Sequence, residues 1–284
     1  MGCRLCPGWG KLAFMNTTLP FHRAVPRPLL GLAAGEAHVW VARLDAERDM
    51  QQLERYRALL DEQEERRLDR LATAALKAEF LLTRALCRET LSRYADVAPR
   101  DWRFEVNAYG KPAISAPALS LSLKFNLSNA RDVAACVVAL EADVGIDIEQ
   151  WSRPDDSLPI TAQIFSASEL HALRNCDPQA RRRLFYELWT LKEAYVKARG
   201  QGLSMNLDEI TLDPRATPIR ATFSPALAQE AQAWHFEQIE FGRDHLLALA
   251  IDARGCAEPR ITVREVALAK DAPGFVGSPL SQRC

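Results

Sequence analysis

The chain has no excess of positive charge and no long apolar run. Its 36 Lys and Arg residues against 37 Asp and Glu residues give a formal net charge of -1 at pH 7, so it lacks the basic excess on which non-specific nucleic-acid binding depends. No apolar stretch reaches the roughly 20 residues that a membrane-spanning helix needs. We therefore expect neither a nucleic-acid partner nor a membrane partner.

A disulfide framework is also missing. The seven cysteines are odd in number, scattered, and mostly embedded in apolar stretches. This usage is typical of reduced thiols, so we expect a cytoplasmic protein. The Cys3 and Cys6 pair has no second Cys or His pair to complete a zinc site, and we interpret it as two exposed thiols.

What is present is an ordinary globular composition with a repeated order of elements. A 284-residue chain with 48% hydrophobic residues has enough apolar mass for one large core or two medium ones. A strand, a helical segment and several strands appear twice, which indicates an α+β fold with two similar halves. The expected strands are 38–44, 102–106, 120–126, 133–140, 144–148, 209–212, 233–240 and 245–251, and the expected helices are 49–94 (one or two), 168–175 and 178–199.

Four segments follow from this order. We expect a poorly ordered N-terminal extension over residues 1–36, an N-terminal subdomain over 37–143 and a C-terminal subdomain over 144–255. After residue 255 the alternation is lost, so residues 256–284 are expected to form a loose C-terminal tail.

Two carboxylates stand out in the segment 144–149. Alternation along a strand places Asp147 and Glu149 on one face and Ile146 and Ile148 on the other. Two neighbouring acids repel unless something cationic neutralises them, and oxygen-only ligation suits Mg²⁺ or Mn²⁺. The alternative is an edge strand with a solvated face.

The expected helix 178–199 carries a second polar stripe. Trp189, Glu193 and Lys197 follow one another at intervals of four residues and share a helix face. The simple alternative is a stabilising Glu-Lys helix pair. The helix is followed by Gly200-Gln-Gly202, which predicts a sharply turned loop.

Basic residues supply a third feature. Lys111 lies in a turn between Gly110 and Pro112, and Arg84 and Arg88 are one helical turn apart. Arginine forks and a lysine point charge both suit phosphate groups. For the two arginines, a solvated helix face is an equally good interpretation.

Taken together, these segments resemble one family. Tyr109-Gly-Lys-Pro112, Phe125-Asn-Leu-Ser128, the 144–149 strand and the 189–204 helix and loop resemble the motifs of the Sfp-type 4′-phosphopantetheinyl transferases. The resemblance implies a monomer of two similar α+β subdomains related by pseudo-twofold symmetry, with coenzyme A and Mg²⁺ in the cleft between them. It implies transfer of phosphopantetheine to a serine of an apo acyl, peptidyl or aryl carrier protein.

The resemblance also implies a role for each matching position. Asp147, Glu149 and Glu193 match metal ligands, and Lys197 matches a lysine near the pyrophosphate. Contacts to coenzyme A fall at Lys111, Gly110, Pro112, Ser128, Asn129, Arg88 and, as the weakest match, Arg67.

One position departs from the family pattern. Asn129 follows Ser128 where many members have a histidine near the 3′-phosphate. An amide donates a hydrogen bond but carries no charge, so we expect a weaker or differently shared grip on that phosphate.

The implied reaction has the carrier serine attack the β-phosphorus of coenzyme A, releasing adenosine 3′,5′-bisphosphate. Glu193 acting directly and Glu149 acting through a metal-bound water are competing assignments for the base. Two other functions fit parts of the pattern, a metal-dependent phosphohydrolase and a coenzyme A or carrier-binding module without turnover. Candidates for docking an acidic carrier are Arg153, Arg174 and the arginines 181–183, with a solvated helix face as the alternative.

Overall fold

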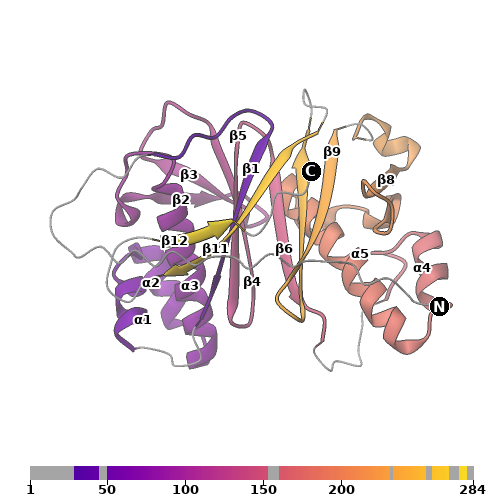
Figure 1. Ribbon diagram of the computed structural model, residues 1–284, viewed down its shortest axis with the longest axis horizontal. Coiled ribbons are helices and arrows are strands. Elements are labelled where there is room, and N and C mark those ends of the chain that lie inside the picture. Colours follow the sequence, from indigo (N-terminus) through magenta and orange to yellow (C-terminus); the bar gives the residue numbers. More distant parts are fainter. Residues whose placement is uncertain are drawn as a thin grey trace, which may run out of the picture.

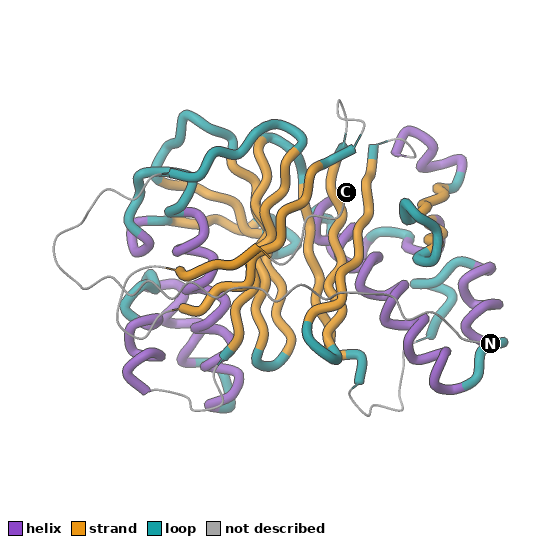
Figure 2. The backbone as a smooth tube through the Cα atoms, viewed as in Figure 1, coloured by secondary structure: helices purple, strands orange, loops and turns teal. Residues whose placement is uncertain are grey.

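The computed structural model describes residues 29–44, 50–152, 160–230, 233–253, 258–268 and 275–279. Two β-sheets form the middle of the molecule, and helices lie on the outside of both (Figures 1 and 2). The expected N-terminal extension falls outside the described residues as far as residue 28. Of the helices in the described ranges, none is both long and apolar enough to cross a bilayer.

The first half of the molecule contains a sheet of five strands in the order β12-β11-β1-β5-β4 and a small β2-β3 hairpin. Its elements are β1 (Glu36–Arg43), α1 (Met50–Arg57), α2 (Glu62–Asp69), α3 (Ala74–Leu91), the 3₁₀ turn Pro99–Asp101, β2 (Arg103–Val106), β3 (Pro112–Ala116), β4 (Leu123–Ala130) and β5 (Val133–Leu140), joined by β11 (Arg260–Leu268) and β12 (Phe275–Pro279).

The second half contains a sheet in the order β6-β10-β9 and a small β7-β8 hairpin. Its elements are β6 (Val144–Gln150), α4 (Ala167–Arg174), α5 (Pro178–Arg199), the 3₁₀ turns Gly202–Ser204, Leu207–Glu209 and Pro225–Glu230, β7 (Ile210–Asp213), β8 (Arg220–Phe223), β9 (Trp234–Phe241) and β10 (His245–Asp252).

The two halves share one chain order. In each half a first strand is followed by helices, a small hairpin and two antiparallel strands, and the sheet orders β1-β5-β4 and β6-β10-β9 correspond. The α+β prediction with two similar halves is therefore confirmed.

Alternation along the strands builds three cores. In β1, Trp40 faces the helices of the first half, whereas Val39 and Val41 face the second sheet. In β6, Ile146 and Ile148 enter that same central core, so the residues between them face α5. The inner faces of the two sheets thus pack together while the outer faces bind the helices.

The helical region 49–94 contains three helices rather than one or two. Asp61 begins α2 because its side chain accepts the N–H groups of Gln63 and Glu64, and Glu64 completes a capping box. Thr73 begins α3 by accepting the N–H of Leu76. These two caps lie within a continuous helical pattern, which is why the periodicity alone did not separate the helices.

The expected loose tail is wrong for residues 260–268. Strand β11 pairs in parallel with β1, and β12 pairs with β11. The alternation of apolar and polar residues along β11 is interrupted because Arg264 occupies one of the positions that face the helices. The Arg264 guanidinium lies 5.1 Å from the centre of the Trp40 ring, where it packs as an apolar residue would.

Candidate active site

The site begins with a close approach of strand β6 to helix α5, which Gly145 permits. A Cβ atom at Gly145 would lie 2.0 Å from the Ala194 carbonyl oxygen and 2.4 Å from the Ala198 nitrogen, so only glycine fits without moving the backbone. The helix-facing side of β6 also carries Asp147 and Glu149. The contact therefore brings both carboxylates against the face of α5.

Asp147 and Lys197 form the centre of the site. The Lys197 Nζ atom lies 2.6 Å from Asp147 Oδ1 and 2.9 Å from Ser128 Oγ, and the Ser128 hydroxyl is 3.0 Å from the same Asp147 oxygen. Asp147 is only 3% exposed, so burial strengthens this ion pair relative to one at the surface. The structure thus joins one residue each from β4, β6 and α5.

Strand β4 holds β6 in place through side chains rather than a backbone ladder. The Asn126 Oδ1 atom accepts the Ile146 N–H at 3.1 Å, and Ser128 Oγ accepts the Ile148 N–H at 3.2 Å. Both side chains are buried. They satisfy backbone donors at the edge of the second sheet that would otherwise lack partners.

The charges of Asp147 and Lys197 act on Glu149 and Glu193. Burial and the neighbouring Asp147 charge raise the pKa of Glu149 to about 7, against the opposing effects of Lys197 and a hydrogen bond from Trp189. Burial and Asp147 also raise the pKa of Glu193, and Lys197 again opposes them. The charge of Asp147 therefore acts on both Glu149 and Glu193.

The donor chemistry fits a divalent cation. Asp147 Oδ2 is buried without a hydrogen-bond partner among the described residues, and an oxygen-only donor set suits Mg²⁺ or Mn²⁺. Across the part of the chain that the structure describes, however, no three acidic, His or Cys side chains form a ready metal site. Lys197 is the group that contacts Asp147, and the binding of a metal by the three carboxylates stays a prediction.

The turn carrying Lys111 packs against the end of α5. The Asn107 side-chain amide donates to the Gly200 carbonyl at 2.7 Å, and Lys111 Nζ donates to the Ala198 carbonyl. Gly200 has a φ of +64° as the helix cap, and a Cβ there would lie 2.6 Å from Lys111 Cδ. Burial lowers the pKa of Lys111, partly offset by Asp143. Two of the motifs thus meet at the junction between the halves.

Arg88 does not reach any surface, which disagrees with its predicted contact to a substrate phosphate. It is 0% exposed, and its guanidinium contacts Glu64 at 2.6 Å and Asp61 at 3.2 Å and donates to the Trp102 carbonyl at 2.8 Å. Its donors are used to hold α2 on α3.

Arg67 and Arg84 lie near each other on the helices of the first half. Their guanidinium groups are 5.7 and 5.1 Å from the ring centre of Phe80. Arg67 is exposed, whereas Arg84 also lies 3.7 Å from Glu64. Figure 1 shows α2 and α3 on the outside of the first half, and both arginines belong to this layer of helices.

Asn129 is exposed, and by strand alternation it points to the opposite side of β4 from Ser128. The proposed docking arginines are also placed differently from one another. Arg181 donates to the Leu173 and Cys176 carbonyls, and Arg183 pairs with glutamates. Arg174 is exposed, and Arg153 lies outside the described residues.

Two residues of structural importance were missed at the sequence level. Asn126 lies in the segment Phe125-Asn-Leu-Ser128, and no role was predicted for its side chain. Its placement two residues before Ser128 puts both side chains on one strand face. Lys192 is buried at 1% exposure, where it pairs with Glu169 at 2.9 Å and donates to the Leu207 and Ile210 carbonyls. Its position on the apolar side of the α5 pattern was the available signal.

Parts of the sequence match known proteins. A family model described as the 4′-phosphopantetheinyl transferase superfamily matches residues 143–250, which include β6 and α5. The 4′-phosphopantetheinyl transferase HetI of Nostoc sp. is 29% identical over 235 residues, covering 82% of this chain and 95% of HetI. The 4′-phosphopantetheinyl transferase Sfp of Bacillus subtilis is 36% identical over 132 residues, covering 46% of this chain and 56% of Sfp.

Among solved structures, a holo-(acyl-carrier-protein) synthase from Bacillus anthracis aligns with 37% of this chain and 94% of its own, at 19% identity and a TM-score of 0.32. That overall similarity is too low for a comparison of folds. The family model covers the strand and the helix that build the site, and residues 143–250 of this chain therefore match the 4′-phosphopantetheinyl transferase superfamily.

Proposed function

We propose that this protein transfers the 4′-phosphopantetheine group of coenzyme A to a serine of an apo carrier protein. The observation that carries the proposal is the joining of Ser128, Asp147 and Lys197 beside two further carboxylates, in a chain whose residues 143–250 match this superfamily. A positive group held by a buried acid suits a reaction in which negative charge moves between phosphoryl oxygens.

Lys197 is the group that stabilises the negative charge on the phosphoryl oxygens as the serine attacks the β-phosphorus and adenosine 3′,5′-bisphosphate leaves. The Lys197 side chain is 27% exposed, so it is only partly enclosed where its ammonium contacts Asp147 and Ser128. A charge held in place before the substrate arrives costs no reorganisation during the reaction. Ser128 acts as a positioning residue because its hydroxyl contacts both members of the ion pair.

Asp147, Glu149 and Glu193 would hold Mg²⁺, with the unpartnered Asp147 Oδ2 atom as the best-supported ligand. A bound Mg²⁺ supplies Lewis-acid neutralisation of phosphoryl charge. Protein treated with EDTA and assayed without added Mg²⁺ is expected to give no transfer.

Glu193 is our assignment for the base that accepts the serine proton. Its carboxylate projects from α5 beside Asp147, and burial raises its pKa, which makes it a stronger proton acceptor than a solvated glutamate. Glu149 has the same property, with a pKa of about 7. Substituting each glutamate by glutamine and comparing the transfer rates decides between them.

The proposed function is tested by the intact mass of a carrier protein. The full chain is incubated with coenzyme A, Mg²⁺ and several apo carriers of fatty-acid, polyketide and peptide synthesis. A phosphopantetheine-sized mass gain on at least one carrier is expected, and none on the same carrier with its acceptor serine changed to alanine. Phosphate release from coenzyme A without a mass gain on any carrier would contradict the proposal.

A further inference from the structure

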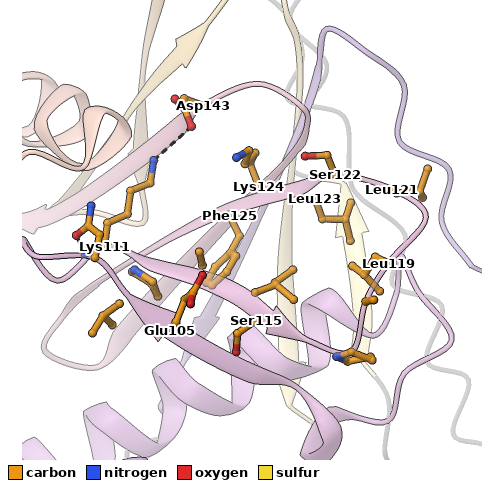
Figure 3. A pocket seen from close by; sticks show the side chains of 17 residues that line it. Glu105, Lys111, Ser115, Leu119, Leu121, Ser122, Leu123, Lys124, Phe125 and Asp143 are labelled. Carbon is orange, nitrogen blue, oxygen red and sulfur yellow. Dashed lines mark hydrogen bonds and ion pairs between the residues drawn. The ribbon is translucent and has the colours of Figure 1, made fainter.

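The two ends of strand β6 are held by different contacts. Just before its start, on the rim of the pocket in Figure 3, Asp143 lies 3.6 Å from Lys111 of the turn between β2 and β3. At its other end the ladder with β10 stops at Gln150, and residues 150–152, the exit segment, follow directly after Glu149. The end of a strand opens locally unless other contacts hold it. The contacts of the exit segment therefore determine how firmly Glu149 is held.

Asp244, in the turn between β9 and β10, contacts every residue of the exit segment. The Gln150 Nε2 atom donates to Asp244 Oδ2 at 2.6 Å, the Ser152 hydroxyl donates to the same oxygen at 2.8 Å, and the Trp151 N–H donates to the Asp244 carbonyl at 3.0 Å. The Gln150 hydrogen bond lowers the pKa of Asp244 against a smaller opposing effect of burial, and the bond from Ser152 lowers it further. The acceptor is therefore a carboxylate at neutral pH, and hydrogen bonds to a charged acceptor are the stronger kind.

The turn that carries Asp244 is itself fixed. Phe241 pairs with His245 across the hairpin, and Gly242 between them has a φ of +67°, which a tight hairpin loop requires. The guanidinium of Arg43, at the end of β1, lies 4.1 Å from the centre of the Phe241 ring, and a Cβ at Gly242 would lie 2.5 Å from Arg43 Nη2. Asp244 is thus presented from a closed loop that packs against the first half.

A second contact holds the exit segment from the side of α5. Alternation places Trp151 on the same face of β6 as Asp147 and Glu149. The Arg183 guanidinium lies 5.2 Å from the centre of the Trp151 ring and is itself paired with glutamates of α5 and β9. Asp147 is held by Lys197. Glu149 therefore lies between one strand position held by Lys197 and another held by Arg183 and the β9-β10 turn.

We propose that Asp244 is a positioning residue for the transfer reaction, which fixes the exit segment and, through it, the direction of the Glu149 side chain toward α5. This inference rests on the proposed function, because it takes Glu149 to act in the site. Asp244 acts through the exit segment and does not itself contact the substrates. The alternative is a turn aspartate that stabilises the hairpin without any effect on the reaction.

The kinetic test uses the full chain in the carrier-mass assay. Asp244→Ala removes the acceptor and is expected to lower kcat about tenfold, with the KM for coenzyme A and for the carrier within about twofold, because a misdirected group slows the reaction step rather than binding. Asp244→Asn keeps one oxygen that accepts from Gln150 and Ser152, so kcat is expected to stay within about threefold. Rates are measured well below the unfolding midpoint of every variant, so that a loss of stability alone does not change kcat.

The matched control is Asp213→Ala. It removes another turn carboxylate of the second half, which accepts the Arg215 N–H at 3.1 Å, and it is expected to leave kcat within about twofold. A double substitution tests the route of the effect. Because Asp244 acts through Ser152 among others, Asp244→Ala combined with Ser152→Ala is expected to cost no more than Asp244→Ala alone.

Hydrogen–deuterium exchange followed by mass spectrometry measures the exit segment directly, on the full chain without coenzyme A or metal. The peptide that covers residues 148–152 is expected to exchange about tenfold faster in Asp244→Ala than in the unaltered protein, because local opening of the segment becomes easier. Asp213→Ala is expected to leave that peptide unchanged. A peptide from β5 serves as the internal reference in every variant.

The outcomes separate the positioning role from the function. An unchanged kcat in Asp244→Ala, or a raised KM for the carrier at unchanged kcat, would overturn the role in an active enzyme. A loss in Asp244→Asn as large as in Asp244→Ala, additive losses with Ser152→Ala, or unchanged exchange of the 148–152 peptide would overturn it as well. Failure of the proposed function appears instead as no mass gain on any carrier with the unaltered protein, and it would remove this role whatever the exchange shows.

Discussion

In each half of the molecule a buried ion pair attaches a short helix to a long one, yet only one half carries the proposed chemistry. In the first half, Arg88 on α3 contacts Glu64, the third residue of α2 and a member of its capping box. In the second half, Lys192 on α5 contacts Glu169, the third residue of α4 and a member of its capping box. Both cations are buried at 0–1% exposure.

The correspondence extends to the small hairpins. Arg88 also donates to the carbonyl of Trp102, directly before β2, and Lys192 donates to the carbonyl of Ile210, where β7 begins. In both halves one buried cation therefore joins a short helix, a long helix and the start of a hairpin. This match supports the relationship between the halves more strongly than the order of elements does.

The halves differ at the residues next to this ion pair. Five positions after the buried cation, the second half has Lys197, which contacts Asp147 on β6. The first half has Arg93, whose guanidinium lies 5.0 Å from the ring centre of Trp40 on β1. The Trp40 indole of the first half thus occupies the place that the Asp147 carboxylate has in the second half. The comparison shows that the framework tolerates either group, and in our proposal the acids on the first strand of the second half supply the chemistry.

The largest expected effect tests this difference directly. Glu193→Gln is expected to lower carrier transfer by roughly two to four orders of magnitude and to leave coenzyme A affinity largely intact, because it removes a base but no substrate contact. Glu89→Gln, the equivalent change one residue after Arg88, is expected to leave the rate within about twofold, since our proposal places no catalytic carboxylate in the first half. Rates come from the mass of the carrier over time. Similar losses in both variants would contradict a division of labour between the halves.

The buried pairs give the next effect. Lys192→Met and Arg88→Met each leave a buried carboxylate without its partner and are expected to lower the free energy of unfolding by about 3–5 kcal/mol. The exposed ion pair of Arg66 with Glu62 provides a control, and Arg66→Met is expected to cost less than about 1 kcal/mol. Urea unfolding measures all three. A small loss at one buried pair and a large loss at the other would show that the two ion pairs are not equivalent.

Gly145→Ala is expected to have a smaller effect on stability, of about 1–3 kcal/mol, because the added Cβ meets the backbone of α5. Transfer is expected to fall as well, since the same contact positions Asp147. Gly31→Ala, where a Cβ meets nothing within 4 Å, is the matched control for urea unfolding and transfer. An unchanged transfer rate in Gly145→Ala would show that the close approach of β6 and α5 is not required.

The smallest effect concerns the pH dependence of the first half. Burial, followed by the Arg264 charge, lowers the pKa of His38 to about 4. The His38 Nδ1 atom shares a 2.8 Å hydrogen bond with the Tyr94 hydroxyl, which also accepts the Trp40 indole N–H. The unfolded chain therefore binds a proton before the folded chain does. The stability contribution of neutral His38 is complete above pH 6.5 and is lost as the pH falls from 6.5 toward 4.

Urea midpoints at pH 7 and pH 4.5 test this. His38→Asn keeps a hydrogen-bonding group for Tyr94 but does not titrate, so its midpoint is expected to fall less between the two pH values than that of the unaltered protein. The exposed His171→Asn is the control and is expected to retain the full decrease. An equal decrease in His38→Asn would remove His38 as its source.

The sequence predicted the elements that depend on local period. Asp147 and Glu149 were placed on one strand face by alternation, and Glu193 and Lys197 on one helix face by the helical repeat. Their proximity to one another followed only from the family resemblance, because no local pattern states that β6 approaches α5. Gly145 makes that approach possible, but a glycine in a strand does not reveal which backbone lies above it.

The misplacement of Arg88 has the same origin. Its partner Glu64 is 24 residues earlier in the chain. The sequence of a helix does not show whether an arginine on it faces solvent or a buried carboxylate. The parallel pairing of β11 with β1 joins residues from opposite ends of the chain, which no local period encodes. Tertiary contacts of long range thus account for both errors.

The side-chain contacts between β4 and β6 have a mechanical consequence. A backbone ladder at this position would fuse the two sheets into one continuous surface with a fixed twist. Because Asn126 and Ser128 contact β6 through rotatable side chains, small rotations of one half against the other do not break a row of strand hydrogen bonds. The same two side chains cover donors at an edge that another chain would otherwise pair with. The contact between β4 and β6 therefore tolerates small rotations of the two halves, and its edge is not open to pairing with a strand of another chain.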